Sequence, residues 1–319
     1  MPSTVGPSLS PEFIQVLYRL LAAAGLCFAL SFLSDAFLTT GNILNVLRQA
    51  SLLFFMAAGL TLVILTGGLD LSVGANIGLS ACLAASVLKA TDSATLAVLV
   101  GVSVGLAVGL VNGMLVTVLH IPSFIATYGM LWFVHGITFA FMAGETVHGF
   151  PQSFRFIGSG FVLGIPVPVF VMLGFLALGT FLTRWTTFGQ EIYAIGANPE
   201  AARLSGIPIR RRLIAAYVAS GGMAGLASIV FLARLNSAEG DIGESLTLPA
   251  IAAVLIGGTS LFGGVGTLLG TLVGALILTL VLNGMNLFAI HTNWQPLITG
   301  VIIVLAVYLD MVMRRHLKA

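Results

Sequence analysis

Charged residues are scarce in this chain, which has 319 residues of which only 8% are Asp, Glu, Lys or Arg. Soluble globular domains carry roughly a quarter of such residues, so this composition cannot cover a water-exposed surface. Hydrophobic residues make up 58% of the chain, and its mean hydropathy is +1.09. A helix needs about 20 apolar residues to cross a bilayer. The composition therefore predicts an all-α, polytopic transmembrane protein and excludes a folded soluble domain.

Lysine, cysteine and clustered histidine are also scarce. The two lysines, Lys89 and Lys318, do not occur in a Walker A phosphate-binding loop, so any ATP that drives this protein must be hydrolysed by another chain. The two cysteines, Cys27 and Cys82, lie in apolar runs and are typical of core positions. The five histidines show no metal-ligand spacing, and the net charge of +2 gives no reason to expect nucleic acid. We expect no metal, no cofactor and no enzymatic activity.

Apolar runs predict about ten membrane segments within a single domain that spans residues 1–319. The eighth is short and bounded by paired glycines, which is typical of a broken or re-entrant helix. The ten are Phe13–Leu33, Leu47–Leu65, Val73–Ala90, Thr95–Leu119, Phe124–Ala143, Phe161–Leu182, Leu213–Ala233, Leu248–Phe262, Thr267–Met285 and Pro296–Met313.

The distribution of basic residues predicts the orientation of these segments. The longest polar connection, residues 184–212, contains five arginines, and the C-terminal tail adds Arg314, Arg315 and Lys318. Because cytoplasmic loops carry an excess of Lys and Arg, we expect this loop and both termini to be cytoplasmic. The opposite side receives only Arg48, Lys89, Arg155 and Arg234. Trp132 lies inside a predicted segment, away from the interfaces where tryptophan is usually found.

Two series of glycines recur at every fourth position, a spacing that allows helix backbones to approach closely in lipid. They are Gly101, Gly105, Gly109 and Gly113, and Gly266, Gly270 and Gly274. Two interpretations remain open: tight packing within one chain, or a seam between two identical chains.

Within the loop at residues 184–212, the run from Asn198 to Gly206 has the signals of a short helix. Asn198 suits the N-cap, Pro199 the first helical position, Glu200 the first turn and Gly206 the C-terminal stop. A two-turn helix is marginal in water by itself. We therefore expect it to dock, either on a partner protein or on anionic lipid.

Asp70 follows the pair Gly67-Gly68 inside a membrane-forming run, where an ionisable residue is a functional hypothesis by default. It is either an N-cap that accepts from the amides of Ser72 or Val73, or a point on a solute pathway. Other polar or aromatic residues that are candidates for that pathway are Asn76, Asn112, Thr127, Asn283 and Asn286, with Phe124 and Tyr128 as stacking partners for a sugar. Hydrogen bonding between helices also explains the polar ones.

Several of these runs resemble the permeases of ATP-binding-cassette (ABC) importers. Glu200-Ala201-Ala202-x-x-x-Gly206 is similar to the loop that forms the coupling helix in such permeases. Other runs resemble the ribose/xylose/galactose permease family, and together they extend from about Asn42 to Asp310. They are Thr66–Gly74, Pro122–Thr127, Ala194–Asn198, Ala252–Leu261 and Asn283–Leu287. Ser123 and Tyr128 depart from the residues common in that family.

The resemblance implies a permease subunit in the bacterial inner membrane that imports a monosaccharide or similar polyol. A second permease protomer, a cytoplasmic ABC ATPase and a periplasmic binding protein would be its partners. The residues implied to couple it to the ATPase are Asn198, Pro199, Glu200, Ala201, Ala202, Arg203 and Gly206. The alternative is an ion- or proton-coupled secondary transporter that uses Asp70. Transport by this chain alone, driven by a gradient, would distinguish that alternative.

Overall fold

The computed structural model describes residues 11–318, and regular structure within this range is almost entirely helical. Thirteen α-helices lie in these residues: α1 Pro11–Leu33, α2 Thr40–Leu65, α3 Val73–Thr91, α4 Ala94–Thr117, α5 Ser123–Met142, α6 Gln152–Ser159, α7 Val167–Trp185, α8 Thr187–Ala197, α9 Pro199–Leu204, α10 Ile209–Leu235, α11 Thr247–Ile256, α12 Leu268–Leu287 and α13 Gln295–Lys318. Two 3₁₀ helices accompany them, η1 Glu244–Leu246 and η2 Thr292–Trp294. The strands are β1 Val147–His148, β2 Phe161–Val162, β3 Ile165–Pro166 and β4 Ser237–Ala238, paired antiparallel as β1–β4 and β2–β3.

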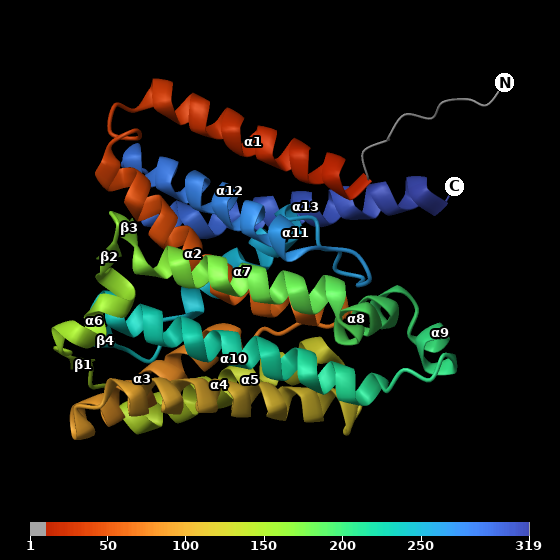
Figure 1. Ribbon diagram of the computed structural model, residues 1–319, viewed down its shortest axis with the longest axis horizontal. Helices are drawn as coiled ribbons and strands as arrows, with labels where there is room; N and C mark the ends of the chain where they lie inside the picture. The colour runs from red at the N-terminus through yellow and green to blue at the C-terminus, as the bar shows by residue number, and fades with distance from the viewer. Residues whose placement is uncertain (1–10, 319) are drawn as a thin grey trace.

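The long helices run along a common direction and form a bundle with two distinct ends (Figure 1). Helices α8 and α9 lie at one end, together with the start of α1 and the end of α13, whereas α6 and the short strands lie at the other. The start of α1 and the end of α13 thus lie at the same end as the loop at residues 184–212, as the charge pattern predicts. Residues 1–10 and 319 lie outside the described range, and the assignment of this end to the cytoplasm stays a prediction.

Seven helices in the described residues are long and apolar enough to cross a membrane: α2, α3, α4, α5, α7, α10 and α12. They correspond to the second to seventh and the ninth predicted segments. Shorter apolar helical stretches, Leu17–Leu33, Glu244–Ile256 and Gln295–Tyr308, fall where the first, eighth and tenth were expected. The all-α, multi-pass membrane architecture is therefore established, while the count of ten stays a prediction. The eighth is a ten-residue helix, α11, consistent with the expected broken segment.

The predicted start of the sixth segment, at Phe161, was wrong. Strands β2 and β3 form a hairpin there, because Leu163 and Gly164 both have positive φ angles, 52° and 78°, as a type I′ turn requires. Helix α7 begins only at Val167, with Pro168 in its first turn, where a missing N–H is tolerated. The apolar run continues unbroken across this change from hairpin to helix.

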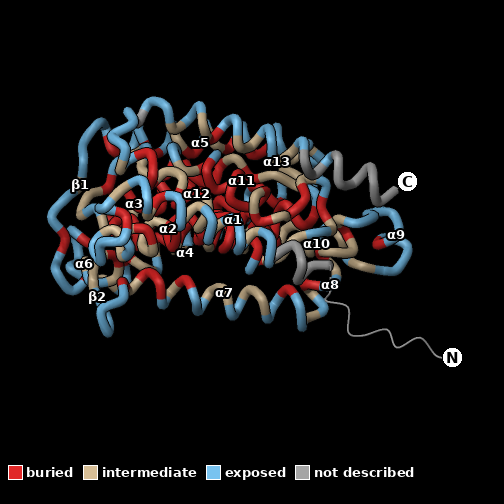
Figure 2. The backbone as a smooth tube through the Cα atoms, turned by 90° about the horizontal axis from the view of Figure 1, so that it is seen from above, coloured by how far each residue is buried: buried red, intermediate tan, exposed pale blue. Residues whose placement is uncertain are grey.

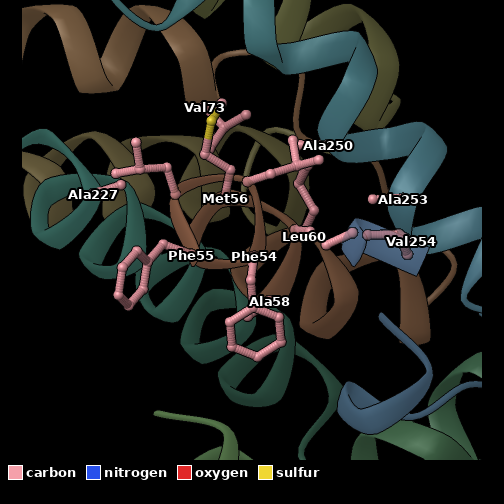
Figure 3. Close-up of a cluster of buried hydrophobic side chains, with 14 of the residues drawn as sticks. Phe54, Phe55, Met56, Ala58, Leu60, Val73, Ala227, Ala250, Ala253 and Val254 are labelled. Carbon is pink, nitrogen blue, oxygen red and sulfur yellow. The ribbon is translucent and has the colours of Figure 1, made fainter. Parts of the chain in front are cut away.

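Helix α2 lies at the centre of the bundle, and residues 50–65 are all buried. Its Phe54, Phe55 and Met56 belong to a core cluster that also includes residues of α10 and α11 (Figure 3). Buried segments gather along this central region, whereas the α6 end and α9 are largely exposed (Figure 2). The fold thus has a buried centre, and the site described below lies at the N-terminal end of α3 and at the α8–α9 end.

The first glycine series packs inside the chain, which confirms one of the two interpretations. Gly101, Gly105, Gly109 and Gly113 of α4 all face α10; a Cβ on Gly105 would lie 2.8 Å from the backbone nitrogen of Gly225. In the second series Gly270 and Gly274 pack on the end of α11, but Gly266 precedes α12 and lies in the loop. The series therefore bring helices of one protomer together.

Candidate functional site

The break between α2 and α3 is a buried, non-helical segment held by two neighbouring helices. Gly67 has a φ of +79°, which ends α2. The carbonyl oxygen of Leu69 accepts hydrogen bonds from the Tyr217 hydroxyl on α10 at 3.2 Å and from the Thr127 hydroxyl on α5 at 3.3 Å. The Leu69 amide donates to the Ser123 hydroxyl at 3.2 Å. The backbone groups that the break releases therefore find partners, as burial requires.

Asp70 is 1% exposed and accepts hydrogen bonds at both carboxylate oxygens. Its Oδ1 accepts from the Ser72 amide at 3.1 Å, the Ser72 hydroxyl at 2.7 Å and Asn112 Nδ2 at 3.4 Å. Its Oδ2 accepts from the Ser220 hydroxyl at 2.9 Å. A buried carboxylate is tolerated only when donors compensate for lost hydration. Asp70 consequently ties the break to α4 through Asn112 and to α10 through Ser220.

The N-cap position falls on Ser72, not on Asp70. The Ser72 side chain makes no capping bond, because its hydroxyl donates to Asp70 and accepts from Asn112 Nδ2 at 2.7 Å. The predicted bond from the Ser72 amide to Asp70 is nevertheless present. Asp70 thus fixes the turn that precedes α3 and does not cap the helix itself.

The other pathway candidates fall into three places. Asn76 is 1% exposed and donates to the Gly105 carbonyl on α4 at 3.3 Å, one turn beyond the Asp70 cluster. Asn283 on α12 exchanges two hydrogen bonds with Asn42 on α2, at 3.1 and 2.7 Å, far from Asp70 along the sequence. Phe124, at the start of α5, is 55% exposed. The structure brings Asp70, Asn112 and Thr127 to the same break, and it places Asn283 in a different helix pair.

Ser220 and Tyr217 complete the site, and the sequence interpretation did not include them. Both lie on α10, about 150 positions from the break. A serine among small apolar residues gives no local signal of a distant carboxylate partner. Tyr217 also explains why residue 68 is a glycine, because a Cβ at that position would lie 2.7 Å from the tyrosine hydroxyl oxygen.

Helix α9 has the cap that the sequence predicts. Asn198 Oδ1 accepts from the amides of Glu200 at 3.1 Å and Ala201 at 3.0 Å, and Pro199 occupies the first turn. Gly206 has a φ of +79°, and its amide donates to the carbonyl of Arg203 at 3.1 Å. The helix ends at Leu204, so it is slightly shorter than two turns.

The surface of α9 is polar with one apolar projection. Glu200 and Arg203 form an exposed ion pair at 2.6 Å, and the Glu200 carboxylate raises the pKa of the Arg203 guanidinium. Leu204 is 78% exposed, whereas Ala202 is buried. An exposed ion pair contributes little to stability. A protruding helix with an exposed leucine at its tip is suited to contact another surface (Figure 1).

Helix α8 connects α9 to a glycine-rich loop, residues 257–266, between α11 and α12. The Tyr193 hydroxyl donates to the Gly266 carbonyl at 2.6 Å. A Cβ on Gly264 would lie 2.8 Å from the Ala197 Cα, so the backbones are in direct contact. The Gly264 amide in turn donates to the Leu65 carbonyl at 2.9 Å, at the end of α2. A continuous series of backbone contacts therefore joins α9 to the break that holds Asp70.

Side chains also connect α8 to the N-terminal end of α10. Arg212 donates to Glu191, and its guanidinium lies 5.9 Å from the centre of the Phe188 ring. Within residues 11–318 no group of three or more His, Cys, Asp or Glu is arranged to hold a metal ion.

These features define a multi-pass α-helical membrane protein that has a buried break between α2 and α3 and a capped helix, α9, that projects from one end. A family model described as "Branched-chain amino acid transport system / permease component" matches residues 42–307, and the chain belongs to this family. Within it the chain is a simple-sugar ABC permease, as the motifs predict.

The relatives support this placement over most of the chain. The ribose import permease protein RbsC of Escherichia coli (strain K12) is 42% identical over 296 residues, which cover 91% of this chain and 92% of the relative. The D-allose transport system permease protein AlsC of the same strain is 37% identical over 277 residues, 86% and 85% of the two chains. The autoinducer 2 import system permease protein LsrC of Klebsiella pneumoniae is 33% identical over 296 residues, 93% and 86%. No solved structure matches this chain.

Proposed function

We propose that this chain translocates a monosaccharide or a similar polyol as the permease subunit of an ABC importer, with ATP hydrolysed by a separate subunit. The observation that carries the proposal is α9, a capped helix that projects from one end of the bundle. The relatives named for ribose and D-allose support the substrate class. The residues Asn198 to Arg203 and Gly206 form the coupling surface in this proposal.

The proposed assembly contains two permease protomers, identical or paralogous. An ATPase docks at the cytoplasmic α8–α9 end, and a periplasmic binding protein delivers solute at the end formed by α6 and the strands. Both termini are then cytoplasmic, in the bacterial inner membrane. Residues 1–319 form one permease domain, with residues 184–212 as its coupling loop.

The contacts at the base of α8 support a mechanical route for coupling. ATP-driven closure of the ATPase moves α9, and α8 transmits the displacement to the glycine-rich loop through Tyr193 and Gly264. That loop is hydrogen-bonded to the end of α2. Because glycine backbones are in contact there, with no side chains between them, a small displacement of α8 reaches the break before α3 without being absorbed by side-chain rotamers.

Among the pathway candidates, we propose that Phe124 and Tyr128, which are 55% and 47% exposed, face solute directly. Asp70, Asn76, Asn112, Thr127 and Asn283 have partners within the chain, and the hydrogen bonds support a role in positioning the helices around the path. All four donors to Asp70 come from neighbouring protein groups. This supports the importer over an ion-coupled secondary transporter in which Asp70 binds the ion.

Reconstitution into liposomes tests the proposal. The chain together with its ATPase and binding protein should take up radiolabelled D-ribose or D-allose only when ATP is present inside the compartment that holds the ATPase. The chain alone, under an imposed proton or sodium gradient, should take up neither sugar. Gradient-driven uptake without the ATPase would contradict the importer and support the secondary transporter.

A further inference from the structure

Helix α5 carries a stripe of aromatic side chains on a face that stays about half exposed among the described residues. Phe124, Tyr128, Trp132 and Phe139 recur at helical spacing and are each between 46% and 55% exposed. His135 lies within the same stripe. Helix α5 packs chiefly on α3 and α4, through a different set of residues that includes Met130 and Val134. We call Phe124, Tyr128, Trp132, His135, Phe139 and Glu244, which is described next, the α5 wall.

The rings of the α5 wall form an unbroken series. Phe124 and Tyr128 are parallel, with centroids 6.1 Å apart and an interplanar angle of 1°. Tyr128 meets Trp132 at 6.4 Å, Trp132 meets His135 at 5.8 Å, and His135 meets Phe139 at 4.4 Å. Aromatic faces are therefore available along nearly the whole length of the helix.

A carboxylate lies against this series. Glu244 Oε2, on η1, is 3.6 Å from His135 Nδ1, and the Glu244 side chain is 45% exposed. Helix α5 has 20 residues, long enough to span a hydrocarbon core of about 30 Å, and His135, its thirteenth residue, lies about 18 Å from its start at 1.5 Å per residue. An exposed carboxylate at that depth is unfavourable against lipid, and such groups usually face a water-filled cavity.

The other exposed face of α5 has a different chemistry. It presents Ile125, Phe133, Ile137 and Phe141, which are all apolar and exposed. This face is suited to lipid. The contrast between two exposed faces of one helix indicates that the α5 wall faces something more polar than hydrocarbon.

We propose that the α5 wall is the solute-facing wall of the translocation path and that it binds a neutral monosaccharide or polyol. Ring faces stack on the apolar C–H faces of the sugar, while Glu244 accepts hydrogen bonds from sugar hydroxyls and the Tyr128 hydroxyl and His135 exchange them. Glu244 and His135 of the α5 wall set the specificity for the sugar, because the hydrogen bonds of Asp70 are made to Ser72, Asn112 and Ser220 within the protein. This inference rests on the proposed function, because it names the surface over which that solute moves.

Thiol labelling tests the water exposure of the α5 wall in the assembled importer. In a Cys27→Ser, Cys82→Ser background, Tyr128→Cys and Trp132→Cys are compared with Phe133→Cys and Ile137→Cys on the apolar face. A membrane-impermeant thiol reagent should label the first pair about tenfold faster, because the reactive thiolate forms in water. D-ribose at saturating concentration should slow that labelling.

Transport of D-ribose supplies the second readout. Glu244→Gln should lower ATP-driven uptake about tenfold, as the loss of a charge-assisted hydrogen bond predicts. Glu239→Gln changes an exposed carboxylate five residues earlier and should leave uptake unchanged.

Three results would each overturn the inference and leave the proposed importer function intact. They are equal labelling of the two faces, labelling that ribose does not slow, and wild-type uptake in Glu244→Gln. If all four positions stay unreactive, the α5 wall packs against another protein surface and the inference is wrong. If the wild-type assembly moves no sugar, the proposed function is wrong and the inference falls with it.

Discussion

Replacing Asp70 with asparagine separates the shape of this side chain from its charge. The asparagine Oδ1 can still accept from the Ser72 amide, the Ser72 hydroxyl and Asn112, which lie 2.7–3.4 Å from Asp70 Oδ1. Its amide group then faces the Ser220 hydroxyl, 2.9 Å from Asp70 Oδ2, and a hydroxyl can accept as well as donate. The hydrogen-bond pattern of the break is therefore preserved.

The expected energetic cost is small for asparagine and large for alanine. Hydrogen bonds to charged groups contribute about 1.5–3 kcal/mol and neutral ones about 0.5–1.5 kcal/mol. The two short bonds, from Ser72 and Ser220, would weaken by about 2 kcal/mol in total, and the lower desolvation cost of an amide offsets about half of that. Asp70→Ala instead leaves the Ser72 amide and the Ser220 hydroxyl buried without an acceptor, which costs about 3–5 kcal/mol.

The assay combines thermal unfolding in detergent with ATP-driven D-ribose uptake in proteoliposomes. Asp70→Asn should unfold a few degrees below wild type and keep most of the uptake, whereas Asp70→Ala should be strongly destabilised. Asp92→Asn, at the exposed C-cap of α3, is the matched control for carboxylate-to-amide exchange. An Asp70→Asn protein that is folded and stable but transports nothing would refute the positioning role and show that translocation needs the charge.

Three further substitutions and one control substitution test the packing, the coupling route and the cap of α9. Gly105→Leu should lower the free energy of unfolding by about 1–3 kcal/mol or more, because the new side chain meets the α10 backbone. Gly129→Leu lies in open space on α5 and should leave the stability unchanged. Thermal unfolding compares the two variants. Gly196→Ala should reduce uptake more than ATP hydrolysis, since a Cβ there meets the Leu65 carbonyl and the Gly264 amide; equal loss of both activities would contradict the coupling route. Asn198→Ala should weaken α9 by about 1 kcal/mol, measured as faster amide hydrogen exchange in residues 200–204.

Local patterns in the sequence predicted the parts of this structure that local chemistry determines. Paired glycines at 67 and 68 marked the break between α2 and α3, and Asn198 with Gly206 marked the two ends of α9. The four-residue glycine spacing indicated a close helix contact, and α4 and α10 make it. For the break and for α9 the signal and the structure lie within about ten residues of each other, whereas the glycine spacing marked only the α4 side of a contact whose partner, α10, lies far along the chain.

What the sequence could not predict depends on contacts between distant residues or on a change of structure within one apolar run. Ser220 and Asp70 are hydrogen-bonded across 150 positions, and Asn42 and Asn283 across 241. The β2–β3 hairpin lies in a run that is as apolar as α7 after it, so the hydropathy pattern predicted one membrane segment that included both. Asp70 illustrates the limit: the sequence predicted that it accepts a hydrogen bond from a neighbouring amide, but the donors Asn112 and Ser220 follow only from how α4 and α10 pack.

The most direct test of the central claim, that α9 is the contact for an ATPase, is copurification of that ATPase with the tagged permease. Glu200→Arg reverses the charge in the first turn of α9 and replaces its ion pair with Arg203 by repulsion. Glu145→Arg makes the same change in an exposed residue near the opposite end of the bundle. The account predicts that Glu200→Arg loses most of the bound ATPase while Glu145→Arg retains it. Equal retention of the ATPase by both variants would contradict the account.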